Sequence, residues 1–231
     1  MPRTQMTVQE VAMCLHIAPR EVVRMAEEGI LSGQRVRGDW MFRTGDVSNW
    51  VEANLQAMPT SQQRGAAPQP MAGLLISAAL QPDAVALDLN AKTKASVVRE
   101  LLALAVKADA AVDGPTLLNA LLDRERQGST AIGEGVAIPH PSRPLPLDRP
   151  VVVFARTATG VPYGDPKGLL TDLFFLMCCP TQHEHLLYLG RLCRMLMDHS
   201  FRKTLRTAAD VDSLLQIIDE FERSVCASQK R

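Results

Sequence analysis

Residues 121–140 read LLDRERQGSTAIGEGVAIPH, and this stretch decides how the larger part of the chain is interpreted. It starts inside a predicted helix that opens at Pro115 and ends near Gln127, because Gly128 interrupts the apolar pattern. A turn over 128–130 and the segment 131–138 follow, and the stretch closes on His140 between two prolines. Flanking prolines hold the backbone extended and stiff, which suits an imidazole kept in one orientation at a surface. Neutral imidazole is a nucleophile near pH 7.

Taken alone, His140 is more simply explained as an ordinary loop histidine. Two other residues change that interpretation. Thr181 and Glu184 form a predicted capping box that opens a long helix over 182–197, which puts His185 in the first turn, where anions are favoured. Arg124 precedes the turn over 128–130, and a guanidinium can bind two phosphate oxygens at once through bidentate hydrogen bonds. A histidine nucleophile, a second histidine at a helix start and an arginine would together make a phosphohistidine site, although spacing does not show that they converge.

The same stretch resembles the signature of the phosphotransferase-system EIIA domains of the fructose, mannitol and nitrogen-regulatory type. LDLNAKTKASVVRELLALA at 87–105 resembles the start of that domain, and HEHLLYLGRLCRML at 183–196 resembles its later active-site helix. The resemblance covers nearly all of residues 74–222. It implies an α/β fold with a mixed sheet flanked by helices, a phosphoryl group carried on His140, and supporting roles for His185 and Arg124.

The resemblance also implies partners. An HPr-type phosphocarrier would donate the phosphoryl group, and an EIIB or a regulatory target protein would be the next partner; no cofactor is implied. The chain departs from many members after the active histidine, where Pro141-Ser142-Arg143 stiffens the loop and displaces the basic residue by one position. This departure concerns the surface on which a partner docks rather than the phosphoryl-accepting histidine.

The first 55 residues predict a separate helix, turn, helix, wing, helix order. Thr7 and Glu10 form a capping box, Pro19 suits the start of a second helix and Gly29 its left-handed end. Residues 34–43 predict a hairpin turning around Gly38-Asp39, and Thr44 can cap a third helix.

This order resembles the excisionase or MerR-like winged helix-turn-helix family, in which the second helix and the wing face DNA. The candidate DNA-binding residues are Arg20, Arg24, Arg35, Arg37 and Arg43. The module has six arginines in all, with Arg3, and seven acidic residues, and DNA affinity rests on neutralising phosphates. Contact with a protein therefore stays open beside DNA binding.

Between the two modules, residues 56–73 are rich in Pro, Gln, Ala and Gly and predict a linker. The expected domains are thus 1–55, a linker over 56–73, and 74–231. Apolar runs at 151–155 and 169–179 predict strands, and together with the long helices they indicate an α/β fold for the larger domain.

The bulk composition adds few constraints. The 231 residues carry a formal net charge of zero, which indicates neither nucleic acid nor an anionic membrane as the bulk partner. Five cysteines without metal-ligand spacing predict reduced thiols, no metal site and a cytoplasmic location. No signal peptide or membrane span is expected. The Gly133-Glu134-Gly135 run lacks a phosphate-loop lysine and predicts a turn.

Three functions follow as alternatives. The first is a regulatory phosphoacceptor of nitrogen-regulatory type, in which the winged helix converts phosphorylation of His140 into an output on DNA or a protein. The second is a transport EIIA that relays phosphate to a sugar-specific EIIB. The third is a DNA-binding protein whose EIIA-like domain is an unphosphorylated scaffold. The first is preferred, and it makes the chain a phosphotransferase-system component, with enzyme status left open.

Overall fold

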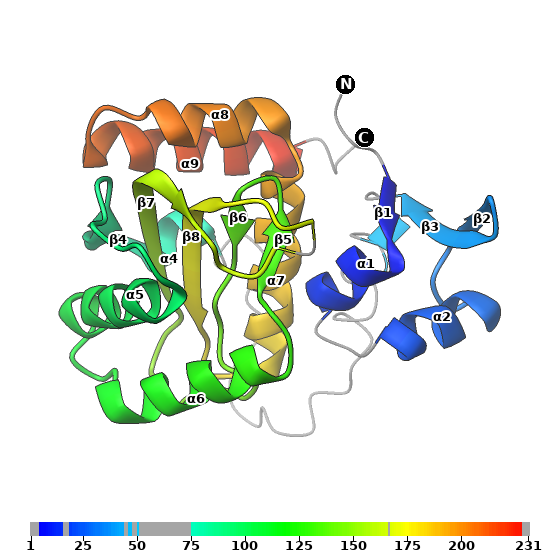
Figure 1. Ribbon diagram of the computed structural model, residues 1–231, viewed down its shortest axis with the longest axis horizontal. Coiled ribbons are helices and arrows are strands. Elements are labelled where there is room, and N and C mark those ends of the chain that lie inside the picture. Colours follow the sequence, from blue (N-terminus) through cyan, green and yellow to red (C-terminus); the bar gives the residue numbers. More distant parts are fainter. Residues whose placement is uncertain are drawn as a thin grey trace.

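The computed structural model describes residues 5–15, 19–43, 46–47, 50, 75–165 and 167–227. Within them, a small N-terminal module lies beside a larger domain of helices around a sheet (Figure 1). The predicted linker over 56–73 lies outside the described residues, so the domain boundaries stay a prediction.

The described part of the N-terminal module includes helices α1 and α2 and a three-stranded antiparallel sheet of order β1-β3-β2. Its elements are β1 (Gln5–Thr7), α1 (Val8–Leu15), α2 (Pro19–Glu27), β2 (Gln34–Val36) and β3 (Asp39–Arg43). The Glu10 carboxylate accepts from the Thr7 amide at 2.7 Å and the Glu10 amide donates to Thr7 Oγ1 at 3.3 Å, so the predicted capping box is present.

Two details of this module differ from expectation. The hairpin turns at Arg37 and Gly38, whose φ angles are 54° and 97°, so that Asp39 already belongs to β3. Strand β1 was not predicted, because three residues carry too short a pattern and the strand exists only by pairing with β3. Of the predicted third helix, only residues 46–47 and 50 are described, and they are helical.

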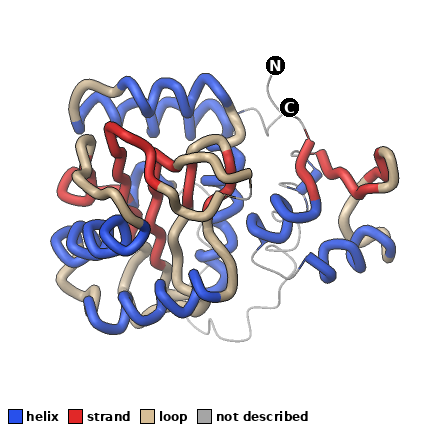
Figure 2. The backbone as a smooth tube through the Cα atoms, viewed as in Figure 1, coloured by secondary structure: helices blue, strands red, loops and turns tan. Residues whose placement is uncertain are grey.

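The larger domain is built on a five-stranded mixed sheet of order β4-β7-β8-β6-β5. Its elements are α4 (Ile76–Ala79), β4 (Leu80–Ala86), α5 (Lys94–Ala108), α6 (Gly114–Arg126), β5 (Ala131–Gly133), β6 (Val136–Ala137), β7 (Val151–Val161), β8 (Thr171–Cys178), α7 (Gln182–Leu196), α8 (His199–Thr207) and α9 (Val211–Ala227). Helices surround this sheet, with α8 and α9 side by side along one end and α6 at the other (Figures 1 and 2).

The central strands are the apolar runs seen in the sequence. β7 and β8 pair antiparallel, and nearly every side chain of 151–155 and 173–178 is buried, as expected of strands covered on both faces. The α/β fold predicted from these runs and the long helices is confirmed.

Five elements of this domain were missed: α4, β4, β5, β6 and α8. β4 is an edge strand interrupted at Pro82-Asp83, where its register with β7 shifts, so its sequence does not alternate as a strand should. β5 and β6 are only three and two residues long, too short to carry a pattern. α8 is short and is capped by Asp198, whose carboxylate accepts from the Phe201 amide at 2.8 Å. The Gly133-Glu134-Gly135 run is the predicted turn, with positive φ at all three residues between β5 and β6.

Candidate phosphohistidine site

Strand order brings three distant segments to one edge of the sheet. β6 and β8 are parallel neighbours, so the chain leaves both at the same edge, His140 after β6 and α7 after β8. β5 is antiparallel to β6, with Ala131 opposite Ala137, so the turn that follows α6 lies at this edge too. Arg124, His140 and His185 meet there for this reason.

His140 makes two hydrogen bonds that define its tautomer. Its Nδ1 lies 2.7 Å from the Ile138 carbonyl oxygen, which can only accept, so Nδ1 carries the proton. Arg124 Nε lies 3.2 Å from Nε2 and can only donate, so Nε2 presents its lone pair. The ring is thus held as a neutral imidazole whose nucleophilic atom is Nε2, next to a cation.

The segment that carries His140 is itself fixed on both sides. The Ile138 amide donates to the Thr130 carbonyl at 3.0 Å, and the Met177 amide donates to the Pro139 carbonyl at 3.0 Å. The backbone before the imidazole is therefore hydrogen-bonded to both the β5 side and β8. This agrees with the rigidity that the two flanking prolines predict.

His185 lies against His140 at the start of α7. The two rings have centroids 5.1 Å apart and are tilted by 54°. Thr181 caps the helix by accepting from the Glu184 amide at 3.1 Å, and the His185 amide donates to the Thr181 carbonyl at 3.0 Å. The cap predicted from the sequence therefore fixes the first turn of α7, and with it the position of His185 beside His140.

Arg124 projects from the last turn of α6. Its Nη1 donates to the Gly128 carbonyl at 2.9 Å, so the turn after the helix orients the guanidinium toward His140. Burial lowers the pKa of Arg124 from its ordinary value, and the neighbouring negative charge of Glu125 opposes that shift. The group stays a cation, because arginine is not deprotonated in proteins.

One expectation about the site was wrong. The sequence suggested an imidazole held at a surface, but His140 is 3% exposed, His185 5% and Arg124 8%. The reason is convergence: each of these polar side chains covers the others, which no single segment reveals.

The site and its fold match known families. Residues 78–221 match the family model described as "Phosphoenolpyruvate-dependent sugar phosphotransferase system, EIIA 2", and residues 6–55 match the helix-turn-helix domain model. The chain belongs to the EIIA type 2 family. The resemblance stated from the sequence is confirmed for both modules.

Similar proteins and structures fall in the same family. The chain is 32% identical over 139 residues to a nitrogen regulatory protein of Bradyrhizobium diazoefficiens, covering 59% of this chain and 90% of that one. It is also 32% identical over 150 residues to the fructose-specific EIIABC component of Bacillus subtilis, covering 64% of this chain but only 24% of that protein. The nitrogen regulatory protein IIA-Ntr of Neisseria meningitidis superimposes with a TM-score of 0.58 at 28% identity, over 62% of this chain and 98% of that one.

Enzyme IIA-Mtl of Escherichia coli, whose structure is known in complex with phosphorylated enzyme IIB-Mtl, aligns with a TM-score of 0.53 at 26% identity. That alignment covers 61% of this chain and 99% of that one. EIIA proteins of this family therefore interact with other phosphotransferase-system components.

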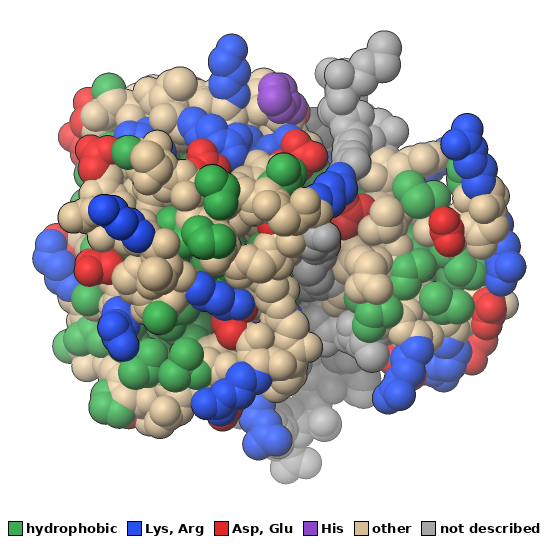
Figure 3. Space-filling model, in the orientation of Figure 1, with side chains coloured by type: hydrophobic (Ala, Val, Ile, Leu, Met, Phe, Trp, Pro, Cys, Tyr) green, Lys and Arg blue, Asp and Glu red, His purple; other side chains and the backbone are tan. Residues whose placement is uncertain are grey.

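In the helix-turn-helix module, the candidate arginines are surface residues with different neighbours. Arg24 pairs with Glu21 at 2.8 Å and with Glu28 at 3.5 Å on its own helix. Arg35 lies 3.5 Å from Glu27 and over the Trp40 ring. Arg20, Arg37 and Arg43 are exposed. Basic and acidic side chains both line the outer edge of this module (Figure 3).

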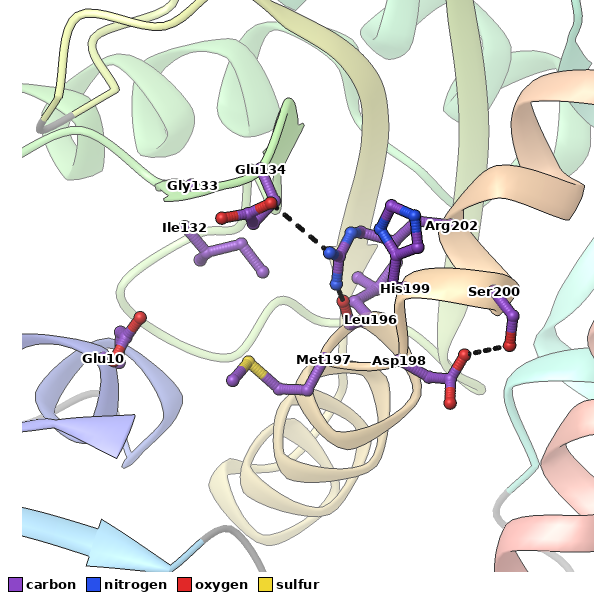
Figure 4. A pocket seen from close by; sticks show the side chains of 10 residues that line it. All are labelled: Glu10, Ile132, Gly133, Glu134, Leu196, Met197, Asp198, His199, Ser200 and Arg202. Atoms are coloured by element: carbon purple, nitrogen blue, oxygen red, sulfur yellow. Dashed lines mark hydrogen bonds and ion pairs between the residues drawn. The ribbon is translucent and has the colours of Figure 1, made fainter. Parts of the chain in front are cut away.

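The two modules meet along α7 and leave a hollow beside it. α1 contacts α7, and a cavity of about 530 Å³ lies between Glu10 of α1, the β5–β6 turn and the α7–α8 corner. Figure 4 shows Glu10 facing Ile132 and Met197 across this space, while Glu134 and Arg202 form an ion pair on its far side. This cavity therefore borders the contact between α1 and α7.

In the part of the chain that the structure describes, no group of histidines, cysteines or carboxylates is arranged to hold a metal ion. None of the helices described is long and apolar enough to cross a bilayer. Cys178, Cys179 and Cys193 are free and buried, and burial raises the pKa of Cys178 to about 12. His16 and the side chain of His183 lie outside the described residues.

Proposed function

We propose that this protein is a regulatory phosphoacceptor of the phosphotransferase system, phosphorylated on His140 by an HPr-type carrier. The observation that carries the proposal is the hydrogen-bonding of the imidazole: Nδ1–H donates to Ile138 and the Nε2 lone pair faces Arg124. This is the protonation state in which Nε2 can attack a phosphorus atom without first losing a proton.

In the proposed transfer, one bond forms and one breaks at phosphorus, and no proton has to leave the His140 ring. The Nε2 lone pair forms a bond to the carrier's phosphoryl group while the bond from phosphorus to the carrier's nitrogen breaks. The proton on Nδ1 stays, and its bond to the Ile138 carbonyl stabilises the positive charge that the ring acquires. The guanidinium of Arg124 then donates to phosphoryl oxygens instead of to Nε2. His185 lies close enough to donate to the same oxygens. Positioning and charge stabilisation do the work, as is usual for phosphoryl transfer.

Labelling tests this assignment. Wild-type protein mixed with ³²P-labelled HPr-type carrier should become labelled, and His140→Ala should not. His199→Ala is the matched control, because His199 is exposed at the start of α8 and lies away from the site. Label on His140→Ala equal to that on wild type would refute the assignment, and an unlabelled wild type would favour the scaffold alternative.

Regulation is preferred over transport because a helix-turn-helix module is attached and contacts the site's own helix. α7 carries His185 in its first turn, and the same helix contacts α1. Farther along α7, Tyr188 Oη donates to the carbonyl of Leu75, the first described residue after the predicted linker, at 3.3 Å. We infer that a phosphoryl group on His140 acts on α7 and thereby on the position of the N-terminal module.

The output of the N-terminal module is proposed to be DNA binding through its wing. Arg37 and Arg43 are exposed on the β2–β3 hairpin. Arg24 of α2 pairs with Glu21 at 2.8 Å and with Glu28, whereas the pair of Arg35 of β2 with Glu27 is 3.5 Å long. The wing is therefore the better candidate for phosphate contacts than α2. Binding to genomic DNA fragments should weaken with rising salt, and the Arg35→Ala plus Arg37→Ala variant should bind more weakly than wild type and than the exposed control Arg223→Ala. Equal binding by all three would favour a protein partner.

Relay to an EIIB is the second candidate, because E. coli IIA-Mtl, a structural relative, forms a complex with phosphorylated IIB-Mtl. Chasing labelled protein with an EIIB separates the two candidates. Rapid loss of label to the EIIB favours transport, and stable label favours regulation.

A further inference from the structure

Glu125 follows Arg124 on the last turn of α6, and its carboxylate contacts Lys94, Thr130 and Tyr163. Its side chain is 7% exposed and forms an ion pair with Lys94 at the start of α5. The Tyr163 hydroxyl donates to Oε1 at 3.3 Å. Thr130 donates to Glu125 twice, from its hydroxyl and from its amide, the latter at 3.3 Å. A buried carboxylate is costly unless such partners surround it.

The Thr130 contacts lead back to the nucleophile in two steps. The Thr130 carbonyl accepts from the Ile138 amide at 3.0 Å. The Ile138 carbonyl, in turn, accepts from His140 Nδ1 at 2.7 Å. By holding both the amide and the hydroxyl of Thr130, Glu125 sets the direction of the Thr130 carbonyl, and through Ile138 the direction of the acceptor for Nδ1–H.

We propose that Glu125 is a positioning residue that keeps His140 in its Nδ1–H tautomer through Thr130 and Ile138. This rests on the proposed function, since the tautomer matters because Nε2 must be the attacking atom. Two consecutive residues of α6 then act on the two nitrogens of one ring, Arg124 directly on Nε2 and Glu125 indirectly on Nδ1.

The chemistry explains why such a residue is useful. The hydrogen bond made by one ring nitrogen decides which nitrogen keeps the proton. If the Ile138 carbonyl turned away, the proton would be free to move to Nε2, and the lone pair needed for attack would be lost. Arg124 cannot prevent this alone, because it must leave Nε2 when the phosphoryl group arrives.

The tautomer is measured directly by long-range ¹H–¹⁵N correlation spectra of the His140 ring in the unphosphorylated protein. Wild type should show Nδ1–H alone. Glu125→Ala should show a detectable but limited Nε2–H population, because Arg124 still donates to Nε2 in the resting site. Glu125→Gln, which keeps an oxygen acceptor for Thr130, should largely restore the wild-type pattern. Asp123→Ala removes an exposed carboxylate from the same helix and should change nothing.

Transfer kinetics give the second readout. Losing the partner that orients a metal-bound histidine typically costs about 10- to 100-fold, and we expect a similar fall in kcat for Glu125→Ala with little change in KM, because Glu125 is too buried to touch the carrier. If Glu125→Ala does not fold, Thr130→Val, which removes only the hydroxyl donor, should show a smaller shift of tautomer in the same direction.

The outcomes separate the two proposals. An unchanged tautomer in folded Glu125→Ala, or in Thr130→Val where Glu125→Ala does not fold, would overturn the role of Glu125 even if wild type accepts phosphate normally. A shifted tautomer in a protein whose wild type accepts no phosphate would uphold the positioning role and refute phosphotransfer.

Discussion

At the scale of single residues, Arg124 has two duties that oppose each other. In the resting site it donates to the Nε2 lone pair and is held there by Gly128, which keeps the nucleophile covered. During transfer it must leave that atom and take phosphoryl oxygens instead. A guanidinium suits both duties, because it has five donors in one plane and can keep one bond while it exchanges another.

This predicts that Arg124→Ala lowers the rate of phosphoryl transfer by roughly 10²- to 10³-fold, the usual loss when one donor to a developing anion is removed. Arg124→Lys should recover part of the rate, since it restores the charge but not the planar fork. The rate is followed by quenched-flow labelling. Arg126→Ala serves as control, because Arg126 is exposed and pairs with Asp123; a loss as large as that of Arg124→Ala would point to damage of α6 instead.

At the scale of elements, helix ends carry the site. Arg124 is in the last turn of α6 and His185 in the first of α7, so the quality of each helix end controls a functional side chain. α5 and α7 begin with the same device, a threonine whose hydroxyl accepts from the amide three residues on, at Thr93 and Thr181. Only the second lies beside His140, which offers a matched pair.

Removing either cap should cost about 1 kcal/mol of stability, but Thr181→Ala should slow transfer more, because fraying of α7 displaces His185 itself. Thr93→Ala should have the smaller effect, because the start of α5 reaches His140 only through Lys94 and Glu125. Urea unfolding and labelling kinetics of both variants provide the comparison. Equal transfer rates would show that the first turn of α7 stays in place without its cap.

The start of α6 predicts a pH effect. Hydrogen bonds from the Thr116 side chain and amide hold the pKa of Asp113 below its ordinary value of 3.8. A carboxyl whose pKa is lower in the folded state stabilises the fold above its unfolded pKa and loses that contribution as pH falls through the folded one. The stability advantage of wild type over Asp113→Ala should thus be constant near neutral pH and shrink below about pH 4. Thermal unfolding of both proteins across this range measures it, and an advantage that does not change would contradict the assignment.

At the scale of the whole molecule, α7 is the element that both modules share. Its N-terminal end belongs to the site, and α1 packs on it. Tyr188 donates to Leu75, which follows the predicted linker, and Arg191 forms an ion pair with Glu222 of α9. Buried Glu222 of α9 completes this junction by accepting from the amides of Ile76 and Ser77 at 2.8 and 3.0 Å. α1 contacts α7 directly, and a cavity borders this contact, so a change in α7 is passed to the N-terminal module through α1.

Phosphorylation should therefore loosen the N-terminal module. A phosphoryl group adds about −1.5 to −2 charges at neutral pH, and its recruitment of Arg124 and His185 disturbs the first turn of α7. Amide hydrogen exchange in α1 should become faster in phosphorylated protein, while His140→Ala treated with the same carrier should exchange as before. Changed exchange around His140 with none in α1 would confine the effect to the site.

The sequence predicted the parts of this protein that depend on neighbouring residues. Caps and breakers such as Thr7, Pro115 and Thr181 act within one turn of chain, so they located α1, α6 and α7. Apolar runs located β7 and β8. β4, interrupted at Pro82-Asp83, and the three-residue β1 escaped prediction because pairing with a distant strand, rather than their own pattern, makes them strands.

The same division applies to the site. The sequence by itself determined which residues are candidates, because a histidine between prolines, a helix-start histidine and an arginine before a glycine turn are local features joined by a family pattern. Only the tertiary structure decided that the three meet, that they are buried, that Nε2 presents the lone pair and that Glu125 reaches the ring through Thr130 and Ile138. These facts depend on the order β8-β6-β5, and strand order is set by packing across the whole domain rather than by the propensity of any segment.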